Sequence, residues 1–326
     1  MTPLTTDARL LNLPTYQADY KTSRAFGHGT RLVLGTSGLG GVWGEVNLQE
    51  SEEAILYALE NRASAFDTAP SYADAEWVLG RALKQWKGDR PFISTKVGRL
   101  RAETAHDFKL DYSSEGIRRS LDHSLNALEV EKIDLLFLHE PQWVDAADIP
   151  RILELMQSFV EEGSVGRLGI GGNLVEAFKP FMGKGKFEVV SGFLKMNACN
   201  LDAFKGDVAF FKTHDLAYYD ASILHFGLLG RRLEDYSEHY EHESDWLKKR
   251  DLEVAWALKA LAEKENMDLS VLAQRYAFGI GEADRIVVGA RTRTQIERTL
   301  KDWEVGPLSK PLFDTVTNLT SSFYKS

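Results

Sequence analysis

The stretch IDLLFLH at residues 133–139 decides the fold, because five of its seven side chains are apolar and a histidine ends the run. Strands of a parallel sheet are buried on both faces, so they read as nearly continuous apolar runs. Other short β-prone segments recur along the chain, and longer helical patterns lie between them. We predict eight strands, at residues 31–34, 65–67, 92–96, 133–139, 167–171, 189–194, 218–222 and 285–289.

The intervening patterns predict helices. Ser51 is a candidate N-cap for a helix that begins near Glu52, and Ser113 or Ser114 is one for a later helix. Apolar residues at intervals of three and four predict further helices at residues 149–160, 251–262, 269–278 and 292–300. Strand–helix alternation with eight strands predicts an α/β fold, the closed (β/α)8 TIM barrel.

We expect one barrel domain over residues 1–326, with additional helices and long loops at the carboxyl ends of the strands. Residues 1–30 are expected to form an N-terminal extension or hairpin. The charged stretch 231–251 is expected to be a loop or a lid, because mixed-sign charge without fixed ligand spacing is typical of a solvated surface.

An open doubly wound sheet is the alternative fold. It would normally carry a Gly-x-Gly-x-x-Gly turn after an early strand. The glycine-rich stretch GTSGLGGVWG at residues 35–44 has Trp43 where the third glycine belongs, so this fingerprint fails.

The charge balance excludes several kinds of partner. The chain has 39 Lys and Arg against 48 Asp and Glu, for a formal net charge of −9. A sequence-independent grip on nucleic acid or anionic lipid needs a surplus of positive charge, so we expect neither partner. No run of about 18 apolar residues is present, so no membrane span is expected. The oligomeric state stays open, a homo-oligomer included.

Cysteine usage and the N-terminal residues bear on the compartment. Cys199 is the only cysteine, so neither an intramolecular disulfide nor a cysteine-based zinc cage is possible. The first residues have neither a basic start nor an apolar stretch, unlike a signal peptide. We therefore expect a cytoplasmic location.

Polar residues follow three of the predicted strands at the end where barrel active sites lie. Asp67 ends the second strand, Tyr72 follows it in the loop, Lys96 ends the third strand and His139 ends the fourth. Each alone is more often a cap, a rim aromatic, a solvated lysine or a packed histidine. Together they predict a proton-donating site.

The chemistry of these four groups fits carbonyl reduction or the reverse alcohol oxidation. A phenol with a pKa of about 10 is a poor acid at neutral pH, and an adjacent ammonium is expected to lower that pKa. A carboxylate would hold the lysine charged, and a neutral imidazole can donate a hydrogen bond to a carbonyl oxygen. The hydride must come from a nicotinamide cofactor.

The sequence resembles the aldo-keto reductases. The resemblance is carried by FDTAPSY at residues 66–72, STK at 94–96 and IDLLFLH at 133–139, and it extends from about Arg31 to about Leu308. It implies an NAD(P)-dependent oxidoreductase with Tyr72 as the general acid or base and Lys96 as the modulator of its pKa. Asp67 would be the partner of Lys96, and His139 would orient the carbonyl.

The resemblance also implies a cofactor site built from later loops. SILHFGLL at residues 222–229 is similar to the family's pyrophosphate loop, and GARTRTQ at 289–295 to its second nucleotide segment. GGN at 171–173 is similar to the sugar-dehydrogenase branch, and FLKMN at 193–197 lacks the glutamine that many members carry. The implied cofactor-binding residues are Gly35, Thr36, Asn173, Tyr219, Ser222, Leu224, Gly227, Leu228, Gly289, Ala290, Arg291, Gln295 and Arg298.

The nucleotide is expected to be NADPH or NADP+ rather than NADH or NAD+. Arg291, Arg293 and Arg298 cluster around the second nucleotide segment. Guanidinium groups bind phosphate oxygens in pairs, which suits a ribose 2′-phosphate. Charges balanced on a solvated helix start are the alternative interpretation of this cluster.

The substrate is expected to be a monosaccharide or a small polyhydroxy aldehyde. The chain looks most like aldose and sugar-alcohol dehydrogenases, the D-threo-aldose and L-galactose dehydrogenase kind. Trp43 and Trp143 are candidates for an aromatic wall over the site, and His225 and Lys195 for contacts to hydroxyl groups.

Two other functions stay open. One is a non-catalytic NADPH-binding regulatory module of the same fold. The other is a metal-dependent barrel hydrolase or isomerase that would use Asp67, His139, Glu140 and His225, although no His-x-His or His-Glu-x-x-His spacing occurs and no metal site is expected.

Overall fold

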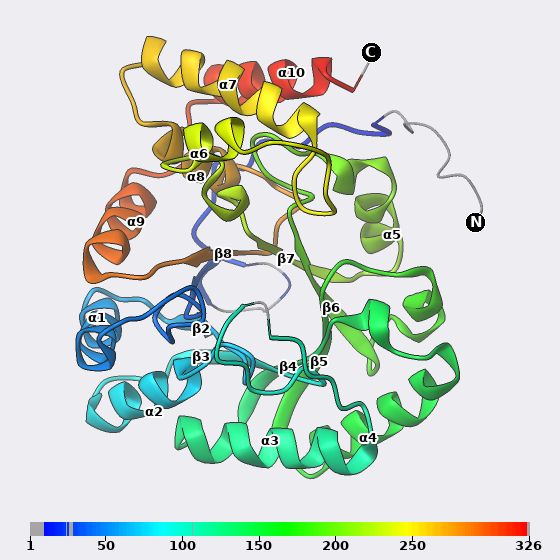
Figure 1. The fold of residues 1–326 in the computed structure, drawn as a ribbon. Helices are drawn as coiled ribbons and strands as arrows, with labels where there is room; N and C mark the ends of the chain where they lie inside the picture. The colour runs from blue at the N-terminus through cyan, green and yellow to red at the C-terminus, as the bar shows by residue number, and fades with distance from the viewer. Residues whose placement is uncertain (1–9, 24, 26–28, 106, 325–326) are drawn as a thin grey trace.

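The protein is a closed barrel of eight parallel strands surrounded by helices, which confirms the predicted fold (Figure 1). The computed structural model describes residues 10–23, 25, 29–105 and 107–324. Neighbouring strands pair in sequence order, and β1 closes the barrel against β8. The strands are β1 Leu32–Gly35, β2 Ala65–Asp67, β3 Phe92–Val97, β4 Ile133–His139, β5 Val165–Gly171, β6 Phe187–Phe193, β7 Ala217–Ala221 and β8 Arg285–Gly289.

Helices cover the outside of the barrel and fill the connections between strands. Their bounds are α1 Leu48–Glu60, α2 Ala75–Gln85, α3 Ser114–Leu128, α4 Ile149–Glu161, α5 Asp207–Thr213, α6 Leu233–Glu238, α7 Lys249–Lys264, α8 Leu269–Phe278, α9 Arg293–Val305 and α10 Lys310–Ser322. The described residues also form the 3-10 turns η1 Pro141–Trp143, η2 Ala146–Asp148, η3 Glu176–Phe181, η4 Asp202–Lys205 and η5 His225–Gly227. Among the described residues, no helix is long and apolar enough to cross a membrane.

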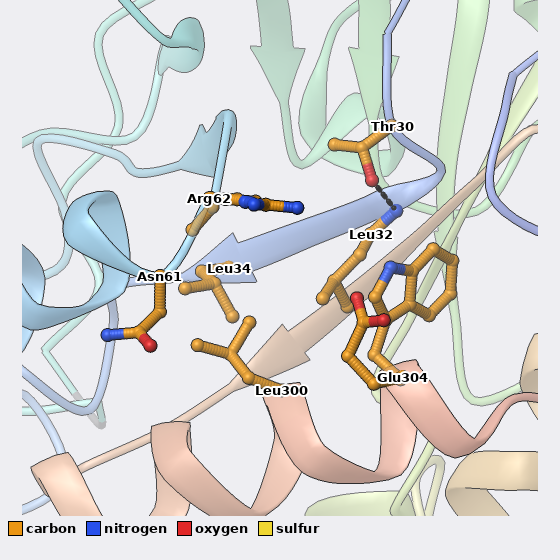
Figure 2. A pocket seen from close by; sticks show the side chains of 9 residues that line it. Thr30, Leu32, Leu34, Asn61, Arg62, Leu300 and Glu304 are labelled. Atoms are coloured by element: carbon orange, nitrogen blue, oxygen red, sulfur yellow. Dashed lines mark hydrogen bonds between the residues drawn. The ribbon is translucent and has the colours of Figure 1, made fainter. Parts of the chain in front are cut away.

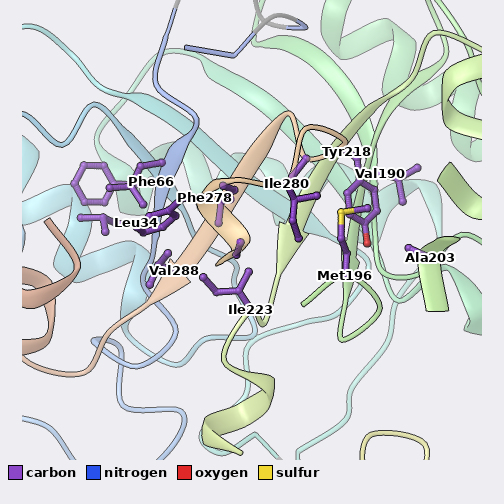
Figure 3. Packing of buried hydrophobic residues seen from close by; sticks show 14 of the residues in the cluster. Leu34, Phe66, Val190, Met196, Ala203, Tyr218, Ile223, Phe278, Ile280 and Val288 are labelled. Atoms are coloured by element: carbon purple, nitrogen blue, oxygen red, sulfur yellow. The ribbon is translucent and has the colours of Figure 1, made fainter. Parts of the chain in front are cut away.

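The core has two layers because successive strand residues point to opposite faces. The inner layer fills the barrel with side chains such as Val33, Leu135 and Phe137. The outer layer packs the strands against the helices, and Figure 3 shows part of it around Phe66 and Val288. Strands buried on both faces account for the apolar runs in the sequence.

Two helix starts test the predicted caps. Ser113 caps α3, since its hydroxyl accepts the Gly116 N–H at 3.0 Å, as predicted. The cap predicted at Ser51 is wrong, because α1 begins earlier. Asn47 accepts the N–H groups of Gln49 and Glu50 there, at 3.0 and 3.3 Å.

The predicted N-terminal extension and the charged stretch 231–251 lie outside the eight strands. Thr22 and Thr30 form an antiparallel bridge, and residues 1–9, 24 and 26–28 lie outside the described part. The stretch 231–251 contains α6, a connecting segment and the start of α7. The α6 helix packs on α7, and α7 packs on α10.

Candidate active site

The four predicted catalytic residues come together at the carboxyl ends of β2, β3 and β4. Asp67 and His139 are the last residues of their strands, and Lys96 is the last but one of β3. Tyr72 lies in the loop after β2, where its N–H donates to Ala69 O at 3.1 Å. Barrel closure therefore brings side chains from three neighbouring strands to one place.

Lys96 and Asp67 form a buried ion pair. The Lys96 Nζ lies 2.6 Å from Asp67 Oδ2, and the two side chains are 4% and 7% exposed. Lys96 also donates to Thr68 O at 2.8 Å, and the Ser94 hydroxyl donates to Asp67 Oδ1 at 2.8 Å. Burial is the largest single effect and disfavours the ammonium, but Asp67 and Tyr72 together outweigh it, and the pKa of Lys96 is raised. The lysine is therefore held charged.

The Tyr72 ring lies beside this ammonium. The Lys96 Nζ is 4.7 Å from the ring centroid, and the His139 ring lies edge-on with 6.2 Å between the centroids. Burial raises the pKa of the Tyr72 phenol, and the Lys96 charge opposes the rise without reversing it. The Lys96 ammonium lowers this pKa as expected, but desolvation of the buried phenol outweighs it, so the net pKa is raised.

His139 is buried and held neutral. Burial, then the charges of Lys96 and Arg99, lower the pKa of the imidazole well below its usual range. Its Nδ1 atom has no hydrogen-bond partner among the described residues. A neutral imidazole has one N–H to donate, as an oxygen-binding group requires.

The site can donate a proton to an oxygen atom that gains negative charge. The Tyr72 phenol can donate a proton, the Lys96 ammonium held by Asp67 lies next to it, and the neutral His139 imidazole can donate a hydrogen bond. Among the described residues, no group of three or more His, Cys, Asp and Glu side chains is arranged to hold a metal ion.

The loop after β7 is unusual in its backbone. Ser222 and Phe226 have φ values of +60° and +51°, and Gly227 has +91°. Non-glycine residues adopt this region rarely, and such residues gather at ligand sites. Of the implied cofactor residues here, Ser222 and Leu224 are partly exposed, whereas Leu228 is fully buried and supports the loop from beneath.

The loop after β8 is open and carries positive charge. Gly289 is exposed with open space where a Cβ would lie, and Ala290 behind it is buried. Gln295 accepts the Arg291 N–H at 2.7 Å and so shapes the turn before α9. Arg291 is partly exposed in this loop, whereas Arg298 lies exposed on α9, where its charge acts on Asp302. The open position at Gly289 next to the Arg291 guanidinium fits a phosphorylated nucleotide.

Arg293 is committed elsewhere. Its Nε lies 2.8 Å from Glu297 Oε1, and its guanidinium stacks over the Tyr57 ring at 4.2 Å. The structure therefore separates Arg293 from the other two arginines of the predicted cluster.

Three implied cofactor residues on other strands support the site from within. Thr36 is fully buried, and both its N–H and its hydroxyl donate to Asp67 O. Gly35 pairs with Asp67 across β1 and β2. Asn173 accepts the Phe193 N–H at 3.1 Å and so joins the ends of β5 and β6.

The structure moves Tyr219 away from the opening. It is fully buried inside the barrel, with its ring edge-on to Phe137 at 5.5 Å and its hydroxyl 3.1 Å from Arg285 Nη1. The prediction of a cofactor contact for Tyr219 is therefore wrong, because the side chain lies too deep. Ala221 is the next residue of β7 on the same face, and it is partly exposed.

The two tryptophans predicted for substrate are exposed. Trp43 is 48% exposed and packs near Phe226, with 5.8 Å between ring centroids. Trp143 is 60% exposed and lies edge-on to Phe108 at 5.6 Å. Both are free to form an aromatic wall.

The two polar residues predicted for substrate are committed elsewhere. His225 is 1% exposed, with Nδ1 3.4 Å from Cys199 Sγ and Nε2 2.9 Å from Trp246 O. Lys195 pairs with Asp207 at 2.9 Å. The predicted substrate contact of His225 is wrong, because its side chain points into the protein and is buried. The backbone φ of His225 is +49°. The ion pair likewise engages the Lys195 charge.

Two residues that the sequence did not indicate contribute to the site. The positive charge of Arg99 acts to lower the pKa of both His139 and Tyr72, and its guanidinium pairs with Glu140 at 2.9 Å. Tyr112 contacts the end of β4. The glycine at position 98, between the Lys96 strand and Arg99, is the signal that this turn is special.

A small cavity lies elsewhere on the barrel wall (Figure 2). Its volume is about 70 Å³, and it is bounded by β1, the end of α1 and α9. It is lined by Thr30, Leu32, Leu34, Asn61, Arg62, Ala63, Leu300, Trp303 and Glu304. None of the predicted site residues contributes to it.

Comparisons with known proteins show the family and the fold of the chain. The sequence model of the Aldo/keto reductase family matches residues 31–320. D-arabinose 1-dehydrogenase of Saccharomyces cerevisiae is 26% identical over 269 residues, which cover 78% of this chain and 76% of that protein. L-galactose dehydrogenase of Arabidopsis thaliana is 24% identical over 275 residues, or 82% of each chain. A glycerol dehydrogenase from Gluconobacter oxydans superposes with a TM-score of 0.73 at 22% identity, covering 94% of this chain and 96% of that one.

Proposed function

The chain belongs to the aldo/keto reductase family and is therefore a nicotinamide-dependent oxidoreductase. On this premise we propose that it interconverts a carbonyl and an alcohol on a monosaccharide or small polyhydroxy aldehyde. In this proposal Tyr72 is the general acid or base. The observation that carries the proposal is the Tyr72 phenol between the buried Lys96–Asp67 pair and a neutral His139.

In the reducing direction, Tyr72 donates its proton to the substrate oxygen and regains one from solvent. Lys96 stabilises the phenolate left behind, and Asp67 holds the lysine in position. His139 donates a hydrogen bond to the same oxygen as charge builds on it. A nicotinamide cofactor, when bound, would supply the hydride for the carbonyl carbon. In the oxidising direction the phenolate accepts the proton of the alcohol.

The raised pKa of Tyr72 bears on direction. A phenol that stays protonated at neutral pH is ready to act as an acid, which suits reduction. Oxidation needs the phenolate, and its rate is expected to rise with pH as the small phenolate fraction grows.

The proposed cofactor is NADPH or NADP+. Arg291 and Arg298 would hold the 2′-phosphate, because both side chains reach solvent near the start of α9 and guanidinium groups bind phosphate oxygens in pairs. The backbone of residues 222–227 and the open position at Gly289 would accommodate the pyrophosphate. Asn173 is the proposed contact for the nicotinamide carboxamide, through its amide nitrogen.

The substrate class rests on the relatives and on the exposed aromatic side chains. Two relatives are a D-arabinose and an L-galactose dehydrogenase by name. Trp43 and Trp143 can stack on the apolar face of a sugar ring. The single buried cysteine fits the reducing cytoplasm as the site of action.

Tyr72→Phe tests the proposal directly. We expect turnover to fall by about two to four orders of magnitude, the usual effect of general acid catalysis, while NADPH still quenches tryptophan fluorescence. The assay follows nicotinamide absorbance with D-arabinose, L-galactose and DL-glyceraldehyde, in both directions and with both nucleotides. Tyr57→Phe, on α1, is the matched control and should keep full activity.

Two results would contradict the proposal. Unchanged turnover in Tyr72→Phe would remove Tyr72 from its role. NADPH binding without turnover of any sugar or aldehyde in the wild-type protein would favour the non-catalytic regulatory module instead.

A further inference from the structure

A tyrosine outside the catalytic set joins the ends of the two strands that carry Lys96 and His139. Tyr112 lies just before α3, and its hydroxyl is 2.9 Å from the main-chain oxygen of His139 and 2.9 Å from that of Glu140. One phenolic O–H thus donates to two consecutive carbonyl groups at the end of β4.

The Tyr112 ring reaches this position by passing over Gly98. A Cβ at Gly98 would lie 2.4 Å from Cε1 of the ring, and the residue has a φ of +100°. Both facts require glycine, which alone leaves room and adopts this backbone without strain. The Gly98 carbonyl also accepts the Asp111 N–H at 2.9 Å. Tyr112 is therefore fixed against the end of β3.

The peptide that Tyr112 holds is itself unusual. Glu140 has a φ of +57°, a region that a non-glycine residue seldom occupies unless its surroundings hold it there. Its carboxylate pairs with Arg99 at 2.9 Å, and the two side chains are largely buried. This is a second link between the ends of β3 and β4. The Tyr112 carbonyl in turn accepts from Arg151 Nη2 at 3.0 Å.

The imidazole of His139 has no comparable support through its ring. Its Nδ1 has no hydrogen-bond partner in the described part of the chain. Histidines are commonly oriented by the hydrogen bond that the second ring nitrogen makes. Without that bond, the direction of the His139 side chain depends on how firmly its own main chain is held.

We propose that Tyr112 is the positioning residue for His139, acting through the main-chain carbonyl groups of His139 and Glu140. This inference rests on the role proposed above for His139. Tyr112 touches neither substrate nor cofactor in this scheme, so its removal should affect turnover only through the imidazole.

The first test is Tyr112→Phe, which removes the hydroxyl and keeps the ring. We expect kcat to fall about 3- to 10-fold, the effect of one or two ordinary hydrogen bonds. KM and the NADPH dissociation constant should change less than twofold. Tyr16→Phe is the matched control, because its hydroxyl also donates to a main-chain carbonyl, that of Leu308 at 3.1 Å, near the N-terminus. It should leave kcat unchanged.

The second test separates positioning from general loosening of the fold. If Tyr112 acts through His139, then Tyr112→Phe should cause no further loss of kcat in a His139→Ala background. A structural defect would lower kcat by the same factor in both backgrounds, and that result would overturn the inference. Unchanged kcat in Tyr112→Phe alone would also overturn it.

A second variant covers the case in which Tyr112→Phe does not fold. Gly98→Ala displaces the Tyr112 ring without removing the hydroxyl, and it should show the same loss of kcat and the same absence of effect in the His139→Ala background. An additive loss here counts against the inference equally. If His139→Ala itself keeps full turnover, the role proposed for His139 fails and the inference with it. If His139→Ala is impaired while Tyr112→Phe and Gly98→Ala are not, only the inference fails.

Discussion

Replacing Lys96 by methionine should destabilise the protein measurably, because it leaves the Asp67 carboxylate buried without its partner. The two side chains are 2.6 Å apart, with only 4% and 7% of their surfaces exposed, so solvent screens them little. Breaking such a pair costs about 3–5 kcal/mol of unfolding free energy. With an unfolding entropy of about 2.1 cal/mol/K per residue, this lowers the Tm of a 326-residue chain by about 4–7 °C.

The double variant Lys96→Met with Asp67→Asn provides the sharper result. It removes both charges and keeps similar volumes, so it should recover most of the lost stability. Thermal unfolding followed by circular dichroism gives the stability of Lys96→Met, Asp67→Asn and the double variant, each without cofactor. As a matched control, Lys84→Met breaks an ion pair with Glu129 whose side chains are 68% and 43% exposed, and it should cost about 1 kcal/mol or less.

The reasoning is refuted if the double variant is as unstable as the sum of the two single variants. That result would mean that packing or the Thr68 contact, rather than the uncompensated charge, determines the loss. All three variants should have greatly reduced turnover, since each removes the charge beside Tyr72 or the group that holds it.

Three further outcomes follow from the structure. Burial raises the pKa of Glu76 to about 7, so between pH 4.5 and 7 the folded protein keeps a proton that the unfolded chain releases. The free energy of unfolding should therefore fall by up to about 3 kcal/mol as the pH rises from 4.5 to 7. In thermal melts, Glu76→Gln should abolish this fall, whereas Glu60→Gln, at an exposed position, should not. Arg291→Ala should weaken NADPH binding about 10- to 100-fold in fluorescence titrations and leave NADH binding unchanged. Arg293→Ala should affect the binding of neither nucleotide strongly, because Arg293 pairs with Glu297. An equal loss of affinity for both nucleotides in Arg291→Ala would refute a 2′-phosphate contact. Tyr219→Phe should lower the free energy of unfolding by about 1 kcal/mol, because it removes the hydrogen bond with Arg285. The NADPH dissociation constant should stay unchanged. Weaker NADPH binding would mean that Tyr219 does contact the cofactor.

The strands and the strand-end placement of the candidate catalytic residues could be predicted from the sequence because both depend on local order. A strand buried on both faces needs consecutive apolar residues, and a barrel places active groups where such a run ends. The predicted ranges 65–67, 133–139 and 285–289 match β2, β4 and β8. The predicted helix at 269–278 matches α8 for the same reason.

Several helices could not be predicted in this way. The α5 and α6 helices have seven and six residues, too few to show a periodic pattern. In α10 the buried face includes Thr317, Thr320 and Ser321, so polar side chains interrupt the apolar signal. The α1 cap was placed at Ser51 because the apolar pattern starts late, whereas Asn47 begins the helix with a solvent-exposed first turn.

The sequence by itself therefore determined the order of the elements, the closure into a barrel and the identity of the groups at the strand ends. Only the tertiary structure decided how deep each side chain lies and what else it touches. The Tyr219 side chain points into the barrel, as alternation along β7 requires, but it lies as deep as Arg285. His225 follows β7 in the chain, yet its side chain turns into the protein toward Cys199. The pKa direction of Tyr72 is likewise a tertiary property, since desolvation depends on atoms from distant parts of the chain that no local pattern specifies.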